Sequence, residues 1–198
     1  MRGILLALLF LAQPLGATQP AWPALHDVID VTSDDRLNVR AAPTARADII
    51  GSFGPSDRGI EIIRPNADET WGLVNIDEGV GWVSLRFLDR QPDQWRASYP
   101  RITACFGAEP FWDIQLGPDT ASFRTPERNV SATPPVRLQS ISPLDRFGLV
   151  METDNGTLRG ILLRQRCTDG MSDQEFGLSI DLIYRDEVML SGCCTLAK

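Results

Sequence analysis

Four cysteines, Cys105, Cys167, Cys193 and Cys194, are the residues of this chain that could do the most varied chemistry. Thiolates can hold a metal ion, act as a redox pair or join strands as disulfides. A zinc site favours cysteines in close pairs such as C-x-x-C, and neither Cys105 nor Cys167 has a near neighbour. Zinc is therefore disfavoured, and the choice between a redox pair and disulfides depends on the compartment.

The N-terminus, MRGILLALLFLAQPLGATQP, has the layout of a secretory signal peptide, residues 1–17. Arg2 precedes an apolar run over residues 4–12, and the small residues Gly16 and Ala17 follow it. The run is far shorter than the roughly 20 residues that a membrane-spanning helix needs. We expect cleavage near Ala17 and a periplasmic or secreted bacterial protein that is not embedded in the membrane. An oxidising compartment favours structural disulfides.

The four cysteines allow three pairings. Adjacent alpha carbons lie about 3.8 Å apart, below the separation of about 4.4 to 6.8 Å that is usual for a disulfide, so Cys193 is not expected to pair with Cys194. In an extended strand these neighbours point to opposite faces and reach different partners. The residues alone leave open whether Cys105 pairs with Cys193 or with Cys194.

Carboxylates supply the other candidates for chemistry. Asp169, Ser172 and Asp173 share one predicted loop and Glu109 lies in another, which could form paired carboxylates or a weak calcium site. Asp and Ser also stabilise turns through their own backbone, and we favour that interpretation. The only histidine, His26, falls in a Pro-rich leader, so serine or cysteine catalysis lacks a base. We expect no enzyme, no metal and no cofactor; a hydrolase using Asp169 or Glu109 is the least favoured alternative.

The composition narrows the classes of partner. The formal net charge is −7, which argues against nucleic acid and against an anionic membrane surface. Hydrophobic residues make up 43% of the 198 residues, enough for one large or two small domains with compact cores.

Short segments with alternating apolar residues fill the first half of the chain after a leader at 18–27. They predict strands, without any helical period, at residues 28–32, 36–40, 48–53, 59–63, 70–76 and 81–88. The polar stretch DRQPDQWRASYPR then interrupts the pattern, and we place a linker at 91–101 between a domain at 28–90 and a domain at 102–198.

The second domain also has strand patterns. Residues 105–117 place Trp112, Ile114 and Leu116 on one face, and residues 177–190 form a similar strand before a turn. Asn155-Gly156 is typical of a two-residue hairpin turn. We expect a meander of roughly six to eight antiparallel strands closed into a barrel, because closure removes exposed edges. The fold class is all-β, with a small N-terminal barrel and a C-terminal barrel held by disulfides.

The first domain resembles a bacterial SH3 domain. The resemblance is carried by LNVRAAPTARADIIGSF (37–53), GIEIIRPNADETWGLVNI (59–76) and GVGWVSLRFL (79–88). It implies an SH3-like barrel without catalytic activity that binds peptidoglycan or wall peptides, or an envelope protein. We expect Trp71 and Trp82 to pack in the core of this small domain, with a ligand contact as the alternative for Trp71. The alternation places the candidate binding residues outward near the loops: Asn38, Arg40, Asp68, Glu69, Trp71 and Asn75.

The second domain resembles a family of uncharacterised bacterial envelope proteins with G-x-E-P-F-W, C-x-D-G-M-S-D and a terminal G-C. The matching stretches are GAEPFW (107–112), CTDGMSD (167–173) and GC (192–193). The resemblance implies pairing of Cys167 with Cys193, because the family shares these two, and hence of Cys105 with Cys194. It transfers no activity, and these motif residues have no assigned role: Glu109, Trp112, Asp169, Met171 and Asp173.

Together these patterns predict an exported, noncatalytic envelope protein. Its SH3-like domain binds cell-wall material, and its second β domain binds another ligand. The alternative is a periplasmic carrier or sensor for a small ligand, with an apolar pocket in the second domain lined by Phe111, Trp112 and Phe123.

Overall fold

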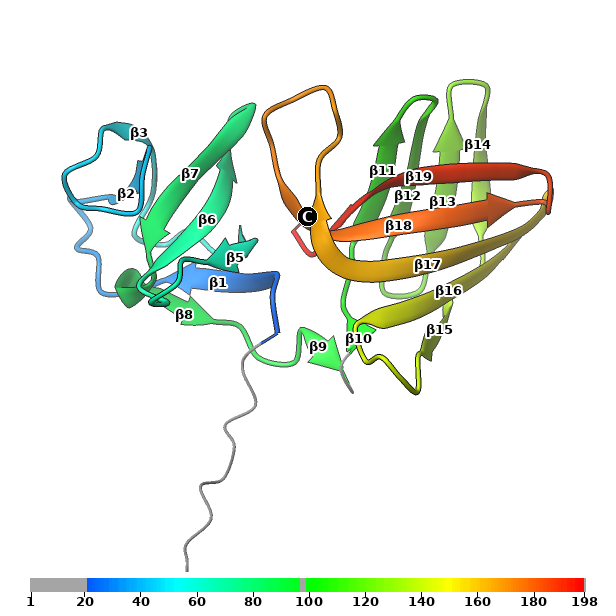
Figure 1. Ribbon diagram of the computed structural model, residues 1–198, viewed down its shortest axis with the longest axis horizontal. Coiled ribbons are helices and arrows are strands. Elements are labelled where there is room, and N and C mark those ends of the chain that lie inside the picture. The colour runs from blue at the N-terminus through cyan, green and yellow to red at the C-terminus, as the bar shows by residue number, and fades with distance from the viewer. Residues whose placement is uncertain (1–20, 97–98, 198) are drawn as a thin grey trace, which may run out of the picture.

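A computed structural model describes residues 21–96 and 99–197, so the predicted signal peptide lies outside the described residues. Within these residues the regular secondary structure is almost entirely β, with one short 3-10 helix, η1 (Leu85–Phe87). Figure 1 shows the N-terminal and C-terminal parts side by side, each built around its own buried apolar cluster. The all-β fold class is confirmed.

The N-terminal domain consists of two sheets that enclose one core. The three-stranded sheet has the order β4-β1-β8, with β4 (Ile60–Ile62), β1 (Ala24–Val28) and β8 (Leu88–Arg90). The five-stranded sheet has the order β3-β2-β7-β6-β5, with β3 (Ile49–Phe53), β2 (Leu37–Arg40), β7 (Gly79–Ser84), β6 (Trp71–Ile76) and β5 (Arg64–Pro65). Leu37, Val39 and Val83 point from the second sheet into this core, as the alternation in β2 predicts.

The first strand lies four residues earlier than the sequence predicts. β1 occupies part of the segment interpreted as a leader, and only Val28 of the predicted strand 28–32 belongs to it. Ala24, His26 and Val28 are buried in alternation, and β1 pairs with both β4 and β8. The alternation is easily missed because prolines crowd the residues just before it, and proline usually marks a loop.

The C-terminal domain is a closed barrel of eight antiparallel strands. They run in the order β14-β13-β12-β11-β19-β18-β17-β16, and a pair between Ala132 of β14 and Thr153 of β16 closes the ring. A ninth strand, β15 (Val136–Gln139), adds to β16 outside the ring. The barrel strands are β11 (Ala104–Ala108), β12 (Phe111–Leu116), β13 (Ala121–Thr125), β14 (Arg128–Ala132), β16 (Arg146–Thr153), β17 (Gly156–Cys167), β18 (Phe176–Tyr184) and β19 (Val188–Thr195).

Packed side chains fill the barrel. Trp112, Ile114 and Leu116 of β12 belong to the buried cluster, as their alternation predicts, and Ile180 and Leu182 join them from β18. The barrel interior is therefore a packed apolar core.

The predicted hairpin joins β16 to β17, but its two loop residues are Asp154 and Asn155, because Gly156 already pairs with Thr153.

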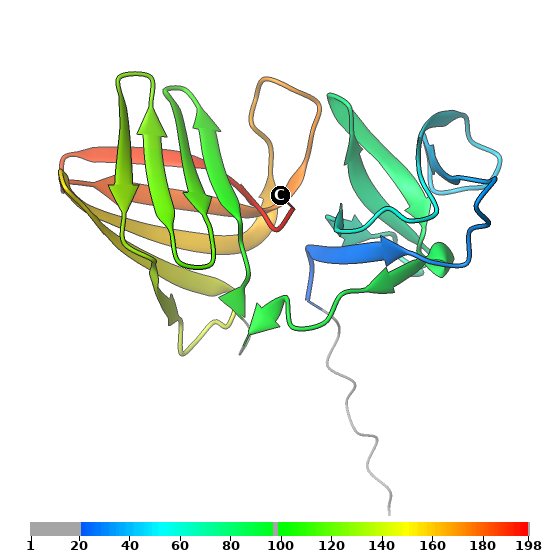
Figure 2. The same cartoon turned by 180° about the vertical axis from the view of Figure 1, so that it is seen from behind.

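The predicted linker contains two short strands and packs against β1. β9 (Trp95–Arg96) pairs with β10 (Tyr99–Pro100), as Figure 2 shows below the C-terminus. The Trp95 indole Nε1 donates a 2.9 Å hydrogen bond to the Pro23 carbonyl, and Gln94 is buried. The segment thus fastens the two domains together.

Candidate functional site

Both disulfides that the family resemblance implies are present. Cys105 is bonded to Cys194 and Cys167 to Cys193. Cys105 and Cys194 face each other in the pairing of β11 with β19 and belong to the barrel core. Cys193, one residue away, points to the other face of β19 and reaches the end of β17. No cysteine in the described residues is free, so these sulfurs serve as crosslinks.

Asp169 organises the loop between β17 and β18. Its Oδ1 accepts hydrogen bonds from the backbone N–H groups of Met171 (3.0 Å) and Ser172 (2.9 Å), and both of its oxygens accept from the Ser172 hydroxyl. Partial burial alone would raise the pKa of Asp169, but the hydrogen bonds from Ser172 and Met171 hold it below its usual value. This carboxylate therefore stabilises a turn, as we favoured from the sequence.

The loop that follows Asp169 holds the β6–β7 hairpin of the N-terminal domain. The Asp173 backbone N–H donates to the Glu78 carbonyl at 2.9 Å, and the Gln174 side chain donates to the Asp77 carbonyl at 2.6 Å. The Asn75 side-chain amide both donates to the Glu175 carbonyl (2.9 Å) and accepts from its N–H (3.0 Å). Asn75, a predicted ligand-binding residue, is instead committed to the interface between the domains.

The two C-terminal motifs meet at an apolar hollow of about 370 Å³, lined in part by the ends of β11 and β12 that flank their turn. Phe111 and Trp112 line it from the first motif, and Asp169 and Met171 from the second. Phe111 and Met171 are exposed, Trp112 belongs to the buried barrel core, and Glu109 is exposed in the adjacent turn.

These positions separate the residues of the predicted carrier pocket. Phe123 lies in the barrel core, 2% exposed, whereas Phe111 is 57% exposed outside it. Trp112 and Phe123 therefore share the buried barrel core and Phe111 does not, and the barrel interior around Phe123 is already filled.

Four of the predicted binding residues share the face of the five-stranded sheet that points away from the core. Asn38 and Arg40 alternate with the core residues of β2, and Trp71 and Asn75 lie on the corresponding face of β6. Asp68 and Glu69 lie at the exposed turn before β6, where Asp68 accepts a 2.6 Å hydrogen bond from the Thr70 hydroxyl. That hydrogen bond lowers the pKa of Asp68 and assigns it to the turn.

Trp82 is the centre of this face, although we expected it in the core. It lies directly opposite Arg40 on one neighbouring strand and Leu73 on the other. The Arg64 guanidinium lies 5.3 Å from the centroid of its ring, and the indole is half-buried. The core position is taken by Gly81, where an added Cβ would lie 2.4 Å from Val39. The core position expected for Trp71 is also wrong, because Trp71 is half-buried on the same face as Trp82, where the alternative of a ligand contact stays a prediction.

The row Arg40, Trp82 and Arg64, with Trp71 nearby, is the candidate binding face. The Arg40 Nη1 donates a 2.7 Å hydrogen bond to the Ala47 carbonyl, which fixes the side chain and leaves its other N–H groups without a protein partner among the described residues. Arg64 has only a long 3.9 Å approach to Glu175. The G-W-V motif could have identified Trp82, since a glycine and a valine in the core place the tryptophan between them outside.

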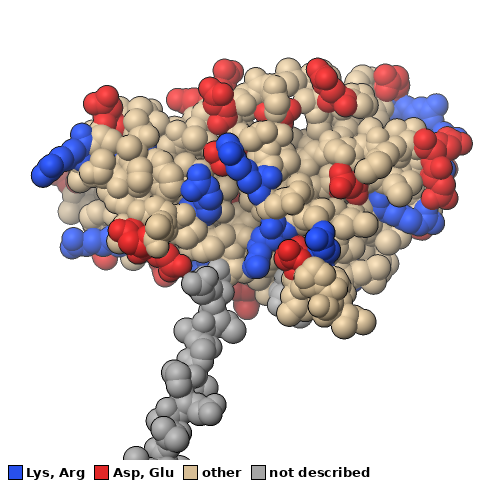
Figure 3. All heavy atoms as spheres, viewed as in Figure 1, with Lys and Arg blue, Asp and Glu red and all other residues tan. Residues whose placement is uncertain are grey.

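Charge is mixed on the face of the molecule that Figure 3 draws. Figure 3 shows acidic and basic side chains interspersed, without a continuous basic area on that face. Across residues 21–96 and 99–197, no group of three or more His, Cys, Asp or Glu side chains is arranged to hold a metal ion. Within the same ranges, no helix is long and apolar enough to cross a membrane.

Comparison with models of protein families, with curated proteins and with solved structures finds no match for this chain. The functional interpretation therefore depends on the geometry of the sites and on the resemblances in the sequence.

Proposed function

We propose that this chain is a noncatalytic binding protein of the bacterial envelope, and that its N-terminal barrel binds the peptides of cell-wall material through the candidate binding face. The observation that carries the proposal is the half-buried Trp82 between Arg40 and Arg64. A guanidinium binds a carboxylate through two parallel hydrogen bonds, and an indole supplies a broad apolar contact. A peptide with a free carboxylate matches both features, and the sequence resemblance to bacterial SH3 domains favours the same class of ligand.

The state of the reactive side chains supports a role without catalysis. Both cysteine pairs are disulfides, and Asp169 is held in its turn by three groups of the loop. The single histidine is buried in β1, with its Nδ1 3.0 Å from the Ala24 carbonyl. None of these groups belongs to the candidate binding face.

The test is cosedimentation of the mature chain, residues 18–198, with purified peptidoglycan at low salt. Replacing both guanidiniums, Arg40→Gln with Arg64→Gln, should raise the apparent dissociation constant about tenfold, equivalent to about 1.4 kcal/mol. Trp82→Ala should weaken binding further by removing the apolar contact.

Arg46→Gln is the matched control, because Arg46 is exposed in the β2–β3 loop and forms no ion pair with a described residue. Thermal unfolding of each variant separates lost binding from lost structure. Wild-type protein that stays in the supernatant, or equal loss in the control, would contradict the proposal.

A further inference from the structure

A cavity of about 1360 Å³ lies between the two domains and is lined by residues of both. Its N-terminal wall includes Glu61 of β4 and Val74 of β6, and its C-terminal wall includes Tyr99, Phe106 and Phe176. The end of β19 lies between the domains, as Figure 2 shows. None of the predicted site residues except Asn75 lines this cavity.

Hydrogen bonds fix the two walls relative to one another. Glu61 Oε2 accepts from the backbone N–H groups of Leu196 and Ala197, each at 3.2 Å, and from the Thr195 hydroxyl. Elsewhere along the interface, Asn75 holds the backbone of Glu175 through two hydrogen bonds. A ligand would therefore meet a preformed site, which lowers the entropic cost of binding.

Two guanidiniums lining this cavity lack an acidic partner. Arg101 and Arg137 are exposed and form no ion pair with any described residue, whereas Arg58, which also lines the cavity, is paired with Asp27 at 2.8 Å. Both line the cavity with Tyr99: the Arg137 Cζ lies 5.8 Å from the centroid of the Tyr99 ring, and Arg101 follows Tyr99 by two residues in the chain. The cavity lining also contains two carboxylates, but Asp57 accepts a hydrogen bond from the Gly54 N–H and Glu61 accepts from the end of β19, so the unpaired charges of the lining are these two guanidiniums.

The wall beside these arginines is aromatic. Phe106 and Phe176 pack edge to face with ring centroids 4.9 Å apart, and both line the cavity with Ile102. The Tyr99 hydroxyl is buried and has no hydrogen-bond partner among the described residues. An unsatisfied buried hydroxyl destabilises the protein, so a ligand oxygen that accepts its hydrogen bond would be stabilising. Burial raises the pKa of Tyr99 to about 12, and the hydroxyl, which is protonated at neutral pH as in any tyrosine, can donate to that oxygen.

We propose that this cavity binds a small organic acid, with its carboxylate or phosphate held by Arg101 and Arg137 and its apolar part against Phe106 and Phe176. A carboxylate and a phosphate both present anionic oxygens, which the planar fork of N–H donors of a guanidinium recognises. The site is separate from the Trp82 face and does not depend on the wall-binding proposal.

The test uses the mature chain and three probes of similar size: phenylacetate, phenyl phosphate and the neutral benzyl alcohol. Calorimetry or ligand-observed NMR should detect binding of at least one of the two acids and a much weaker signal for the alcohol. Comparison of phenylacetate with phenyl phosphate shows which acid the cavity prefers. Added salt should weaken binding of the acid, because it screens exposed charges.

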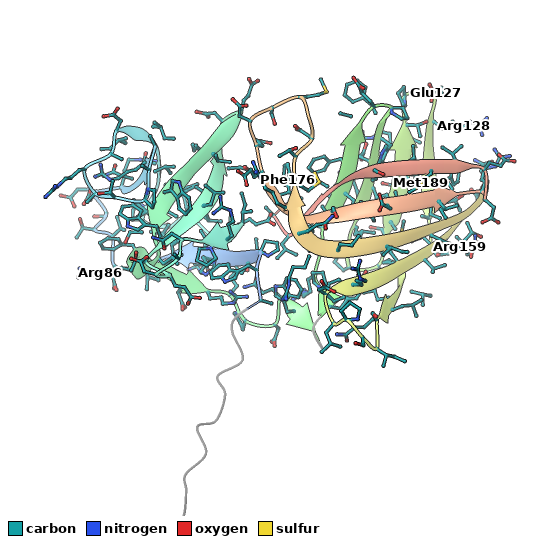
Figure 4. All side chains as sticks on the ribbon, in the orientation of Figure 1. Arg86, Glu127, Arg128, Arg159, Phe176 and Met189 are labelled. Atoms are coloured by element: carbon teal, nitrogen blue, oxygen red, sulfur yellow. A yellow bond between two sulfur atoms is a disulfide. The ribbon has the colours of Figure 1, made fainter. Side chains whose placement is uncertain are left out.

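Arg101→Gln with Arg137→Gln should raise the dissociation constant of the bound acid about tenfold, the loss of about 1.4 kcal/mol expected for removing charged hydrogen bonds. Arg46→Gln with Arg128→Gln removes the same net charge elsewhere and should leave binding unchanged. Figure 4 shows Arg128 on the opposite side of the C-terminal domain from Phe176.

Circular dichroism and thermal melting confirm that both double variants are folded. The proposal is overturned if neither acid binds, if the alcohol binds as well as the acids, or if both double variants lose binding equally. Tyr99→Phe provides a further measurement: loss of affinity without loss of stability places the acid beside the hydroxyl.

Discussion

Burial determines the chemistry of the single histidine. His26 is 4% exposed in β1, stacks on Trp22 with ring centroids 5.6 Å apart, and lies close to the Ala24 carbonyl through its Nδ1. Burial, helped by the nearby Arg90 guanidinium and opposed by the hydrogen bond to Ala24, lowers its pKa from 6.5 to about 4. The side chain is therefore neutral in the folded protein at physiological pH, and its role is structural.

His26 should make the folded protein sensitive to mild acid. Between pH 6.5 and about pH 4 the unfolded chain binds a proton at this histidine and the folded chain does not, so stability falls as the pH is lowered through this window. The shift corresponds to about 3 kcal/mol at most. Urea unfolding of wild type and His26→Gln at several pH values measures the effect. The wild type should lose more stability on acidification, and parallel curves for the two proteins would contradict this account.

Alternation explains which strands could be predicted. β2, β12 and β18 each have one buried face and one exposed face, so a period of two is visible in their sequences. β1 has the same pattern but lies beside prolines, and the sequence there indicates a leader. The position of Trp82 differs from the expectation for another reason. Its size favours a place in the core, but Val39 lies so close to the backbone of β7 that only a glycine, Gly81, fits on the core side of that strand.

The cysteine pair on the outer face of the barrel should stabilise the end of β17. The bond between Cys167 and Cys193 joins positions 26 residues apart. The loop that contacts the N-terminal domain begins directly after Cys167. Replacing both by Ala should lower the free energy of unfolding by about 2–4 kcal/mol, chiefly by freeing the unfolded chain. Cys193→Ala alone should be worse in practice, because the freed Cys167 thiol can exchange with the other disulfide.

Denaturant unfolding measures the loss, and peptide mapping without reduction identifies the bonds in each variant. A redox role would give the opposite result: a bond between Cys167 and Cys193 that is readily reduced, with little change in stability.

The arrangement of the whole molecule is the part that local sequence patterns could not predict. The interdomain cavity is lined by Glu61 of β4, Asn75 of β6 and the end of β19. These groups form their hydrogen bonds across the interface only when both domains have folded. Asn75 and Glu61 are ordinary polar residues of short strands in the sequence, and no local pattern distinguishes a polar residue that faces solvent from one that contacts a second domain. The pairing of β11 with β19 inside the barrel also joins strands that are distant in sequence.

Glu61 should couple the C-terminal end of the chain to the N-terminal domain. Burial raises the pKa of this carboxyl, while hydrogen bonds from Thr195, Ala197 and Leu196 oppose the rise. Glu61→Ala removes the acceptor of two backbone amides and should destabilise the protein by about 1–3 kcal/mol. Glu61→Gln keeps a carbonyl acceptor and should retain most of the stability. Hydrogen exchange provides the local measurement, because the amides of Leu196 and Ala197 should exchange faster in Glu61→Ala and stay protected in Glu61→Gln. Glu187→Ala, a change in the exposed β18–β19 turn, is the control and should leave both amides protected. Unchanged protection of Ala197 in Glu61→Ala would show that the last residues are held by the barrel alone and that the two domains are not coupled through this carboxylate.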